Sequence, residues 1–324
     1  MNWMQKQLWI VLLGFSTFAL GALPSVLGQG HLPDAKRVVF LGDSITHAGG
    51  YIAILETACL IQQPDVAIEW INLGLPSETV SGLTEPGHAG GQFPRPDLHE
   101  RLERVLAQST PNLVVACYGM NDGIYYPLSE SRFQKFREGI ERLHDAVVAT
   151  GAQIIHLTPA YFDALPIRDR LLPGGLDEYR QPYAEYDDVL EAYSRWLLDR
   201  RQDGWVVYDL HQAMKSAVLK RRELDPKFTF ASDGVHPNDE GQSTIARPLA
   251  DAWGLTLRGD GLPDHPHAAK ILELVQKKQQ VLKLAWLTTT RHTRPGIPDG
   301  LPLNQAQAAA VELDQQARAW VRKP

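Results

Sequence analysis

Short apolar runs alternate with amphipathic segments between residues 38 and 253, and this alternation restricts the possible fold more than any other feature. The runs cover residues 38–41, 65–73, 112–117, 153–157 and 205–210. Apolar residues recur at helical spacing over residues 51–62, 98–106, 130–149, 189–196 and 240–253. Runs this short and apolar are typical of strands buried on both faces of a parallel sheet. The sequence therefore predicts an α/β fold with a doubly wound, five-stranded parallel sheet between two helical layers.

The two ends of the chain differ from this pattern. In residues 1–28, Lys6 is the only charge and a long apolar run follows it, as in a signal peptide that directs export to the periplasm or the medium. The run is long enough that an uncleaved membrane anchor is the alternative. We expect the main domain to span residues 29–258. A helical C-terminal extension is predicted over residues 259–324.

Charge and cysteine content exclude several classes of partner and site. Lys plus Arg total 32 against 38 for Asp plus Glu, a net charge of −6, and no basic block is present. Nucleic acid is therefore not an expected partner. The two cysteines, Cys59 and Cys117, lie in apolar segments, which favours separately buried thiols over a disulfide. Two distant cysteines also provide no metal-binding framework.

The extension carries a basic amphipathic helix over residues 268–286 and an Ala-rich helix over residues 305–321. A basic face on the first helix is a solvated surface in one interpretation, or a contact for acidic glycans or a membrane surface in the other. This face contains Lys270, Lys277, Lys278 and Lys283.

Polar residues capable of catalysis follow three of the predicted strands. Gly42-Asp43-Ser44 ends the first run, Asn72-Leu73-Gly74 ends the second, and Gly119-Met120-Asn121-Asp122 ends the third. Open α/β sheets place their chemistry at the carboxyl ends of strands. Ser44 is therefore either a nucleophile or, with Asp43, a cap on the following helix. A fourth block, Asp233-Gly234-Val235-His236-Pro237, places a carboxylate and an imidazole three residues apart in a loop.

Taken together, these four blocks resemble the SGNH, or GDSL-type, hydrolase family. The resemblance covers roughly residues 36–255 and implies a flavodoxin-like three-layer sandwich and a serine esterase without a metal or cofactor. It implies Ser44 as nucleophile, His236 as general base and Asp233 as the carboxylate that orients the base. The implied oxyanion hole consists of the backbone N–H groups of Ser44 and Gly74 and the side-chain amide of Asn121. The chain lacks a GxSxG elbow around Ser44, which argues against an α/β-hydrolase.

The predicted substrate follows from the residues expected near Ser44. Asp43, His88, Arg95, Tyr118 and Tyr125 are the candidate substrate-binding residues. His88 and Arg95 belong to a Gly- and Pro-rich loop over residues 82–96, and loops of this length are often functional. Aromatic and hydrogen-bonding side chains suit sugars better than long acyl chains. By resemblance to exported carbohydrate esterases, the expected substrate is a small acyl ester, such as acetyl, on a glycan.

Three other functions remain open at this point. A lysophospholipase or thioesterase of the same fold would use the same catalytic residues. A metal-dependent phosphoesterase would use Asp43, Asp233 and His236 as ligands, although Ser44 and Asn121 would then have no task. A glycan-binding protein would keep the fold without turnover. Apart from the leader, no membrane contact is expected.

Overall fold

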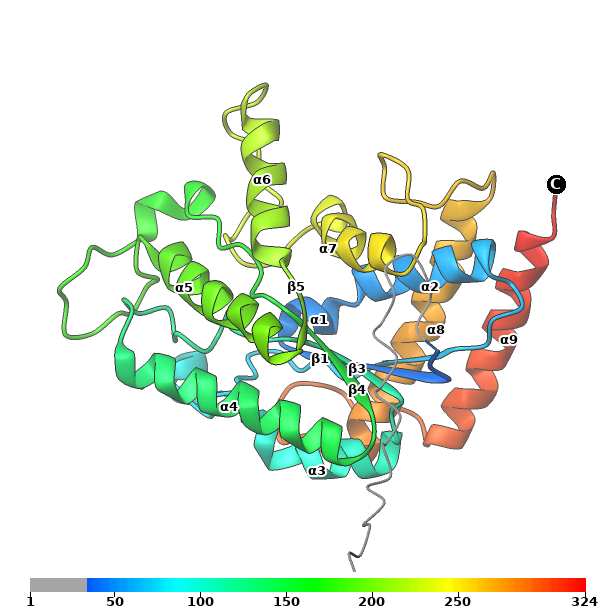
Figure 1. Ribbon diagram of the computed structural model, residues 1–324, viewed down its shortest axis with the longest axis horizontal. Coiled ribbons are helices and arrows are strands. Elements are labelled where there is room, and N and C mark those ends of the chain that lie inside the picture. Colours follow the sequence, from blue (N-terminus) through cyan, green and yellow to red (C-terminus); the bar gives the residue numbers. More distant parts are fainter. Residues whose placement is uncertain (1–33) are drawn as a thin grey trace, which may run out of the picture.

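The computed structural model describes residues 34–324, so the predicted signal peptide or anchor lies outside the described residues (Figure 1). Five parallel strands form one sheet in the order β2-β1-β3-β4-β5. The strands are β1 Arg37–Gly42, β2 Glu69–Asn72, β3 Leu113–Cys117, β4 Gln153–Leu157 and β5 Val206–Tyr208. This architecture confirms the predicted α/β class and the five-stranded parallel sheet.

The strand order determines where polar side chains converge. The chain goes from β1 outward to β2, and then returns across β1 to build the other half of the sheet through β3. In open parallel sheets, a ligand crevice forms at the carboxyl ends of the two strands where the order reverses. Here those strands are β1, which leads into Ser44, and β3, which leads into Asn121.

Helices cover both faces of this sheet. In Figure 1, α2 and α7 lie on one side of the strands, and α3 and α4 lie on the other. The longer α-helices of the main domain are α2 Gly50–Gln62, α3 Leu98–Ser109, α4 Glu130–Ala149, α5 Tyr186–Asp199, α6 Leu210–Arg222 and α7 Asp239–Ala252. The short elements are α1 Ser44–Ala48 and the 3-10 turns η1 His88–Gly91, η2 Leu165–Arg170 and η3 Arg200–Asp203. The bounds of α4 are those that its three- and four-residue spacing predicts.

Helix α6 was not predicted, and β5 is shorter than predicted, for one shared reason. The apolar run over residues 205–210 indicates a strand, but the Asp209 side chain accepts a hydrogen bond from the Gln212 N–H at 3.0 Å. This cap ends the strand at Tyr208 and begins α6 at Leu210. Met214 and Val218 then continue the buried face of α6 at four-residue spacing.

The sheet core is aromatic beside β1 and β2. Phe40 stacks on Trp70 with ring centroids 6.0 Å apart, and Trp70 packs against Trp253 at the end of α7. Both cysteines are buried and free, which confirms the expectation of separate thiols. Burial raises the pKa of the Cys59 thiol to about 11, so this group stays protonated at neutral pH.

The C-terminal extension packs closely on the main domain. It consists of α8 Ala268–Thr289 and α9 Leu303–Val321, with α8 against α2 and β2 and α9 against α8. Lys278 pairs with Glu56 at 2.5 Å and with Asp314 at 2.7 Å. Lys283 is buried and donates to the His47 carbonyl at 2.8 Å.

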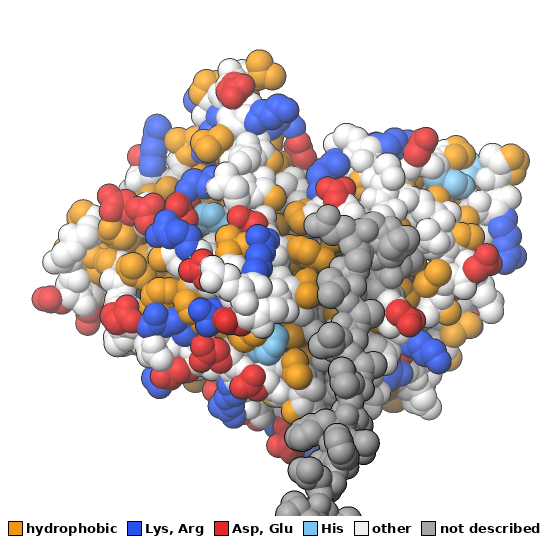
Figure 2. Space-filling view, in the orientation of Figure 1, with side chains coloured by type: hydrophobic (Ala, Val, Ile, Leu, Met, Phe, Trp, Pro, Cys, Tyr) orange, Lys and Arg blue, Asp and Glu red, His pale blue; other side chains and the backbone are white. Residues whose placement is uncertain are grey.

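These contacts contradict the basic face predicted for residues 268–286. Lys278 and Lys283 point inward, and Lys270 and Lys277 are both paired with Glu273. Elsewhere, acidic and basic side chains are interspersed over the face shown in Figure 2. Within residues 34–324, no helix has the length and apolar character needed to cross a membrane.

Candidate active site

Ser44, His236 and Asp233 form a continuous hydrogen-bonded chain across the carboxyl end of the sheet. Ser44 Oγ lies 2.8 Å from His236 Nε2, and His236 Nδ1 lies 2.6 Å from Asp233 Oδ2. Ser44 begins α1 directly after β1, whereas the other two residues come from the loop before α7. The fold therefore joins residues that are 192 positions apart in the sequence.

The loop that carries Asp233 and His236 is held in shape by its own backbone. Asp233 Oδ1 accepts the N–H groups of Val235 at 3.0 Å and His236 at 2.8 Å. Partial burial alone would raise the pKa of Asp233, but these hydrogen bonds and the imidazole lower it below its usual value. Gly234 has a φ of +83°, and its carbonyl accepts the Asp163 N–H at 2.9 Å. The carboxylate is thus ionised at neutral pH and is fixed toward the imidazole.

Asp43, directly before Ser44 in the sequence, has a structural role. It caps α1 by accepting the Ile45 N–H at 2.9 Å, and its side chain is buried. Burial raises its pKa to about 7, with Asp122 and Glu78 adding to the rise. The prediction that Asp43 contacts substrate does not fit this burial. The Asp43 side chain binds the N–H of Ile45 and not that of Ser44. The Ser44 N–H is the first of α1 and therefore has no partner inside the helix.

Gly74 is a predicted oxyanion donor whose N–H is already engaged. It donates to Asn72 Oδ1 at 2.9 Å, while Asn72 Nδ2 donates to the Thr46 carbonyl at 2.9 Å. A Cβ atom at Gly74 would lie 2.4 Å from the His47 backbone nitrogen. The glycine is therefore needed for close packing of the β2 loop on α1, and its N–H is not free to bind substrate.

Ser77, three residues later, differs from Gly74 in its backbone conformation and in the state of its N–H group. Its φ is +68°, in the left-handed region where residues other than glycine are uncommon. Its N–H makes no hydrogen bond to another described residue. The loop over residues 75–78 is attached at both ends. The Leu75 N–H donates to the Gly42 carbonyl at the end of β1, and the Glu78 carbonyl accepts from Asn121 Nδ2. Sequence reasoning missed Ser77 because a serine gives no signal of positive φ.

Asn121 is oriented by three neighbours. Its Oδ1 accepts from Arg95 Nη1 at 2.9 Å and from the Tyr125 hydroxyl at 3.4 Å. Its Nδ2 donates to the Glu78 carbonyl at 3.2 Å, which uses one of the two amide hydrogens. The second amide hydrogen remains available to a ligand.

Most of the predicted substrate-binding residues occupy supporting positions instead. Arg95 is 8% exposed and is clamped by Glu85, which also accepts from His88 Nδ1 at 3.2 Å. Tyr118 is 1% exposed and donates to Glu78 Oε2 at 2.7 Å. Tyr125 is partly buried and stacks on Tyr186. Tyr118 is therefore too deeply buried to contact a substrate, and the guanidinium of Arg95 binds the side chain of Asn121.

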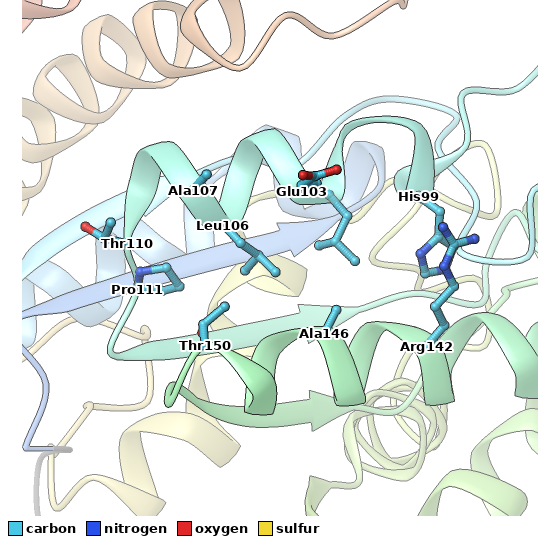
Figure 3. A pocket seen from close by; sticks show the side chains of 10 residues that line it. His99, Glu103, Leu106, Ala107, Thr110, Pro111, Arg142, Ala146 and Thr150 are labelled. Atoms are coloured by element: carbon cyan, nitrogen blue, oxygen red, sulfur yellow. The ribbon is translucent and has the colours of Figure 1, made fainter.

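The side chains of the candidate proton-transfer residues are accessible to solvent. The side chains of His236 and Asp233 remain 54% and 49% exposed. A groove of about 590 Å³ lies elsewhere, between α3 and α4, where Leu106 and His99 face Ala146 and Arg142 (Figure 3). This groove contains none of the predicted site residues. Within residues 34–324, no group of three or more His, Cys, Asp or Glu side chains is arranged to hold a metal ion.

Solved structures with the same fold include enzymes. A gut microbial diltiazem-metabolizing enzyme is 19% identical with a TM-score of 0.54; the match covers 71% of this chain and 50% of that one. The acetylxylan esterase Axe2 from Geobacillus stearothermophilus is 20% identical with a TM-score of 0.50, over 74% of this chain and 100% of that one. The chain thus spans half of the first protein and all of the second. At these identities the likeness shows the fold.

The sequence itself identifies the family. No curated protein matches it. The sequence profile described as the GDSL-like Lipase/Acylhydrolase family matches residues 40–243, well over half of the chain. That range includes the Ser44 and His236 blocks on which the predicted resemblance rests. The protein therefore belongs to the GDSL-like lipase/acylhydrolase family and is a hydrolase of carboxylic esters.

Proposed function

We propose that the protein is a serine esterase that removes small acyl groups, above all acetyl, from carbohydrates. The observation that carries the proposal is the chain of two short contacts, Ser44 Oγ to His236 Nε2 at 2.8 Å and His236 Nδ1 to Asp233 Oδ2 at 2.6 Å. A serine hydroxyl is a weak nucleophile until a base takes its proton, and this geometry supplies the base and the group that orients it.

In the proposed reaction, Ser44 Oγ attacks the acyl carbon while His236 Nε2 accepts the hydroxyl proton. Asp233 holds the Nδ1–H tautomer and stabilises the imidazolium that forms. When the tetrahedral intermediate collapses, His236 gives the proton to the departing sugar oxygen, and an acyl-enzyme remains on Ser44. Water then attacks the acyl carbon while His236 takes a proton from it. When the second tetrahedral intermediate collapses, His236 gives this proton to Ser44 Oγ, which releases the acid and restores the serine hydroxyl.

The negative charge on the carbonyl oxygen needs donors during both steps. We assign this role to the N–H of Ser44, the free amide hydrogen of Asn121 and, in place of Gly74, the N–H of Ser77. Two facts support the replacement: the Gly74 N–H is bound to Asn72 Oδ1, whereas the Ser77 N–H has no partner among the described residues. Such donors act most strongly on charge that develops in the transition state.

The openness of the site supports the substrate class. With about half of each side chain exposed, His236 and Asp233 leave room for a large alcohol such as a sugar chain on the leaving-group side. The grooves of about 590 and 620 Å³ in the described part are lined by neither Ser44 nor His236, so neither accommodates a long acyl chain beside the nucleophile. A neighbour of the same fold is named an acetylxylan esterase, which agrees with this class.

The test compares wild type with Ser44→Ala on p-nitrophenyl esters of increasing chain length and on acetylated xylan, with release of acetate as the readout. We expect activity on acetyl that falls with chain length and disappears in the variant. Preference for long chains would favour the lysophospholipase or thioesterase alternative. Equal activity of wild type and variant would refute the serine mechanism.

A further inference from the structure

Two arginines contact the proposed oxyanion donors from the opposite side of each amide group. Arg95 Nη1 donates to Asn121 Oδ1 at 2.9 Å. Arg294 Nε donates to the Pro76 carbonyl at 3.1 Å, and that carbonyl belongs to the same peptide group as the Ser77 N–H. In each case a guanidinium binds the oxygen of an amide whose N–H is the proposed donor.

Arg294 comes from the C-terminal extension, outside the residues 40–243 that match the family profile. It lies in the loop between α8 and α9, and 218 positions separate it from Pro76. Its guanidinium also rests over the Phe93 ring at 5.3 Å and donates to the Pro295 carbonyl at 2.6 Å. Three contacts therefore fix the side chain in place.

We propose that Arg95 and Arg294 are positioning residues that orient and polarise the two amide donors, so that the C-terminal extension is part of the catalytic unit. This inference rests on the proposed function, because it assigns the arginines to the oxyanion hole of that reaction.

The physical argument begins with the geometry of amides. The peptide bonds of the described residues are trans, so the N–H of Ser77 points away from the Pro76 oxygen that Arg294 holds. Asn121 could rotate by half a turn and exchange its oxygen and nitrogen, which would turn an acceptor toward the oxyanion. A guanidinium has only donors, so Arg95 permits only the orientation that leaves Nδ2 toward the crevice.

Charge adds a second effect. A charged donor on an amide oxygen makes a stronger hydrogen bond than a neutral one and polarises the amide, which strengthens its N–H as a donor. Glu85 holds Arg95 through Nε at 2.6 Å and Nη2 at 2.7 Å, so Nη1 is directed at Asn121. The positive φ of Ser77 costs energy, and the Arg294 contact helps to keep the loop in that conformation.

Arg294 and Arg95 also line one groove of about 340 Å³, together with Phe93. The groove gives a small cation access to the Arg294 site once its side chain is removed. This access makes chemical rescue by guanidinium a practical measurement.

The first experiment compares Arg294→Ala and Arg294→Gln with wild type in hydrolysis of p-nitrophenyl acetate by the full chain. We expect kcat to fall about 10- to 100-fold, the cost of a small displacement in a catalytic group, with KM nearly unchanged. Guanidinium at low millimolar concentration should restore part of kcat in Arg294→Ala, whereas methylammonium should not. A merely structural role would not produce this rescue.

Arg104→Ala is the matched control. Arg104 also joins the extension to the main domain through backbone carbonyls, those of Thr290 and Arg291, both at 3.1 Å. Its hydrogen bonds go to Glu100, Thr290 and Arg291, and none goes to Pro76 or Ser77. We expect a similar loss of thermal stability in this variant and a kcat within about twofold of wild type, because sites that share no partner act independently.

For Arg95, the test is a double-mutant cycle with Asn121. If Arg95 acts through this amide, Arg95→Ala should lower kcat in wild type and change it less than about twofold in an Asn121→Ala background. Arg37→Ala, which breaks an ion pair with Glu69 at the opposite end of β1, should leave kcat unchanged.

The inference is overturned if Arg294→Ala and Arg294→Gln both keep wild-type kcat, if Arg104→Ala loses as much kcat as Arg294→Ala, or if the losses from Arg95 and Asn121 are fully additive. Failure of the proposed function has a different signature. In that case Ser44→Ala, measured in the same assay, would retain activity whatever the arginine variants do.

Discussion

The two halves of the candidate site differ in how the protein holds them. Asp233 and His236, which would move the proton, are about half exposed and lie on a loop. Asn121 and Asp43, on the donor side, are 5% and 3% exposed. Asp43 directly follows β1, and Asn121 lies in the loop that follows β3. One half is open to substrate and solvent, and the other is built into the core.

This difference follows from what each half must do. A base that exchanges protons with substrate and water needs access, and a few backbone hydrogen bonds suffice to aim it. Donors that stabilise a developing charge must not reorient during the reaction, so a rigid, desolvated setting favours them. We therefore expect replacement of the exposed side chains in the open half to affect activity alone, and substitutions in the buried half to affect activity and stability together.

The largest effect is expected for Ser44→Ala and His236→Ala. Each should lower kcat by about 10⁴-fold or more, because the reaction then depends on binding and the oxyanion donors alone. The melting temperature should stay close to that of wild type, since neither side chain is deeply buried. Steady-state kinetics and thermal melts are the measurements. A large drop in melting temperature for His236→Ala would contradict the idea of an open half that is independent of the core.

Asn121→Ala should lower kcat about 100- to 1,000-fold, the usual cost of losing one oxyanion donor. Unlike the previous pair, it should also destabilise the fold, because Arg95 and the Glu78 carbonyl lose buried hydrogen-bond partners. Denaturant unfolding of the variant beside Ser44→Ala measures this difference. If both variants were equally stable, the contrast between the two halves would not hold.

The sequence predicts the open half more readily than the buried half. Asp233 and His236 lie three residues apart in one loop, and Ser44 comes three residues after the apolar run 38–41, so a short stretch of sequence indicates each. The sheet is predictable for the same reason, since local apolar runs mark its strands. The bounds of α4 follow directly from spacing, because an amphipathic helix carries its own periodic signal.

The buried half depends on contacts between distant residues, which single-sequence patterns do not reveal. Gly74 is the natural choice for a donor because glycine permits close approach, yet its role is to pack against α1. The N–H that has no partner among residues 34–324 belongs to Ser77, whose positive φ is imposed by its surroundings. The contacts of Arg95 and Arg294 span 26 and 218 positions and have no local signature.

Gly234→Ala should have an intermediate effect and tests how firmly the open loop must be held. A Cβ atom there would lie 2.7 Å from the Asp163 carbonyl oxygen, and the φ of +83° disfavours any L side chain. The loop must shift, so we expect kcat to fall about 10-fold or more as His236 moves from Ser44. The loss of stability should be about 1–2 kcal/mol, the cost of one strained residue.

Asn238→Ala is a useful comparison for that variant. It removes the side-chain cap of α7, which accepts the Gly241 N–H at 2.9 Å, and should cost about 1 kcal/mol without moving Gly234. Activity measured beside stability separates the two effects. Equal losses of kcat in Gly234→Ala and Asn238→Ala would show that any local loss of stability displaces the loop, and that the strain at Gly234 has no specific effect.

The smallest effect on catalysis is expected at Asp43. The pH dependence of the folding stability shows what it costs to bury this carboxyl group. Its pKa is about 7 in the folded protein against 3.8 for an exposed Asp, so between these values the folded state binds the extra proton. Stability therefore falls as pH rises from about 4 to about 7, by up to about 4 kcal/mol. Asp43→Asn keeps an oxygen to cap Ile45 but cannot ionise, and its stability should gain on wild type over this range.

Asp122 makes the comparison between these two proteins necessary. Burial raises its pKa to about 6, so it adds a fall of the same sign in wild type and in Asp43→Asn alike. Only the difference between the two unfolding curves, measured in urea at several pH values, isolates Asp43 together with its repulsion of Asp122. A difference that stays constant from pH 4 to pH 8 would mean that Asp43 is already ionised in the folded protein. The buried half of the site would then hold Asp43 as a charged carboxylate, although burial should keep this group protonated.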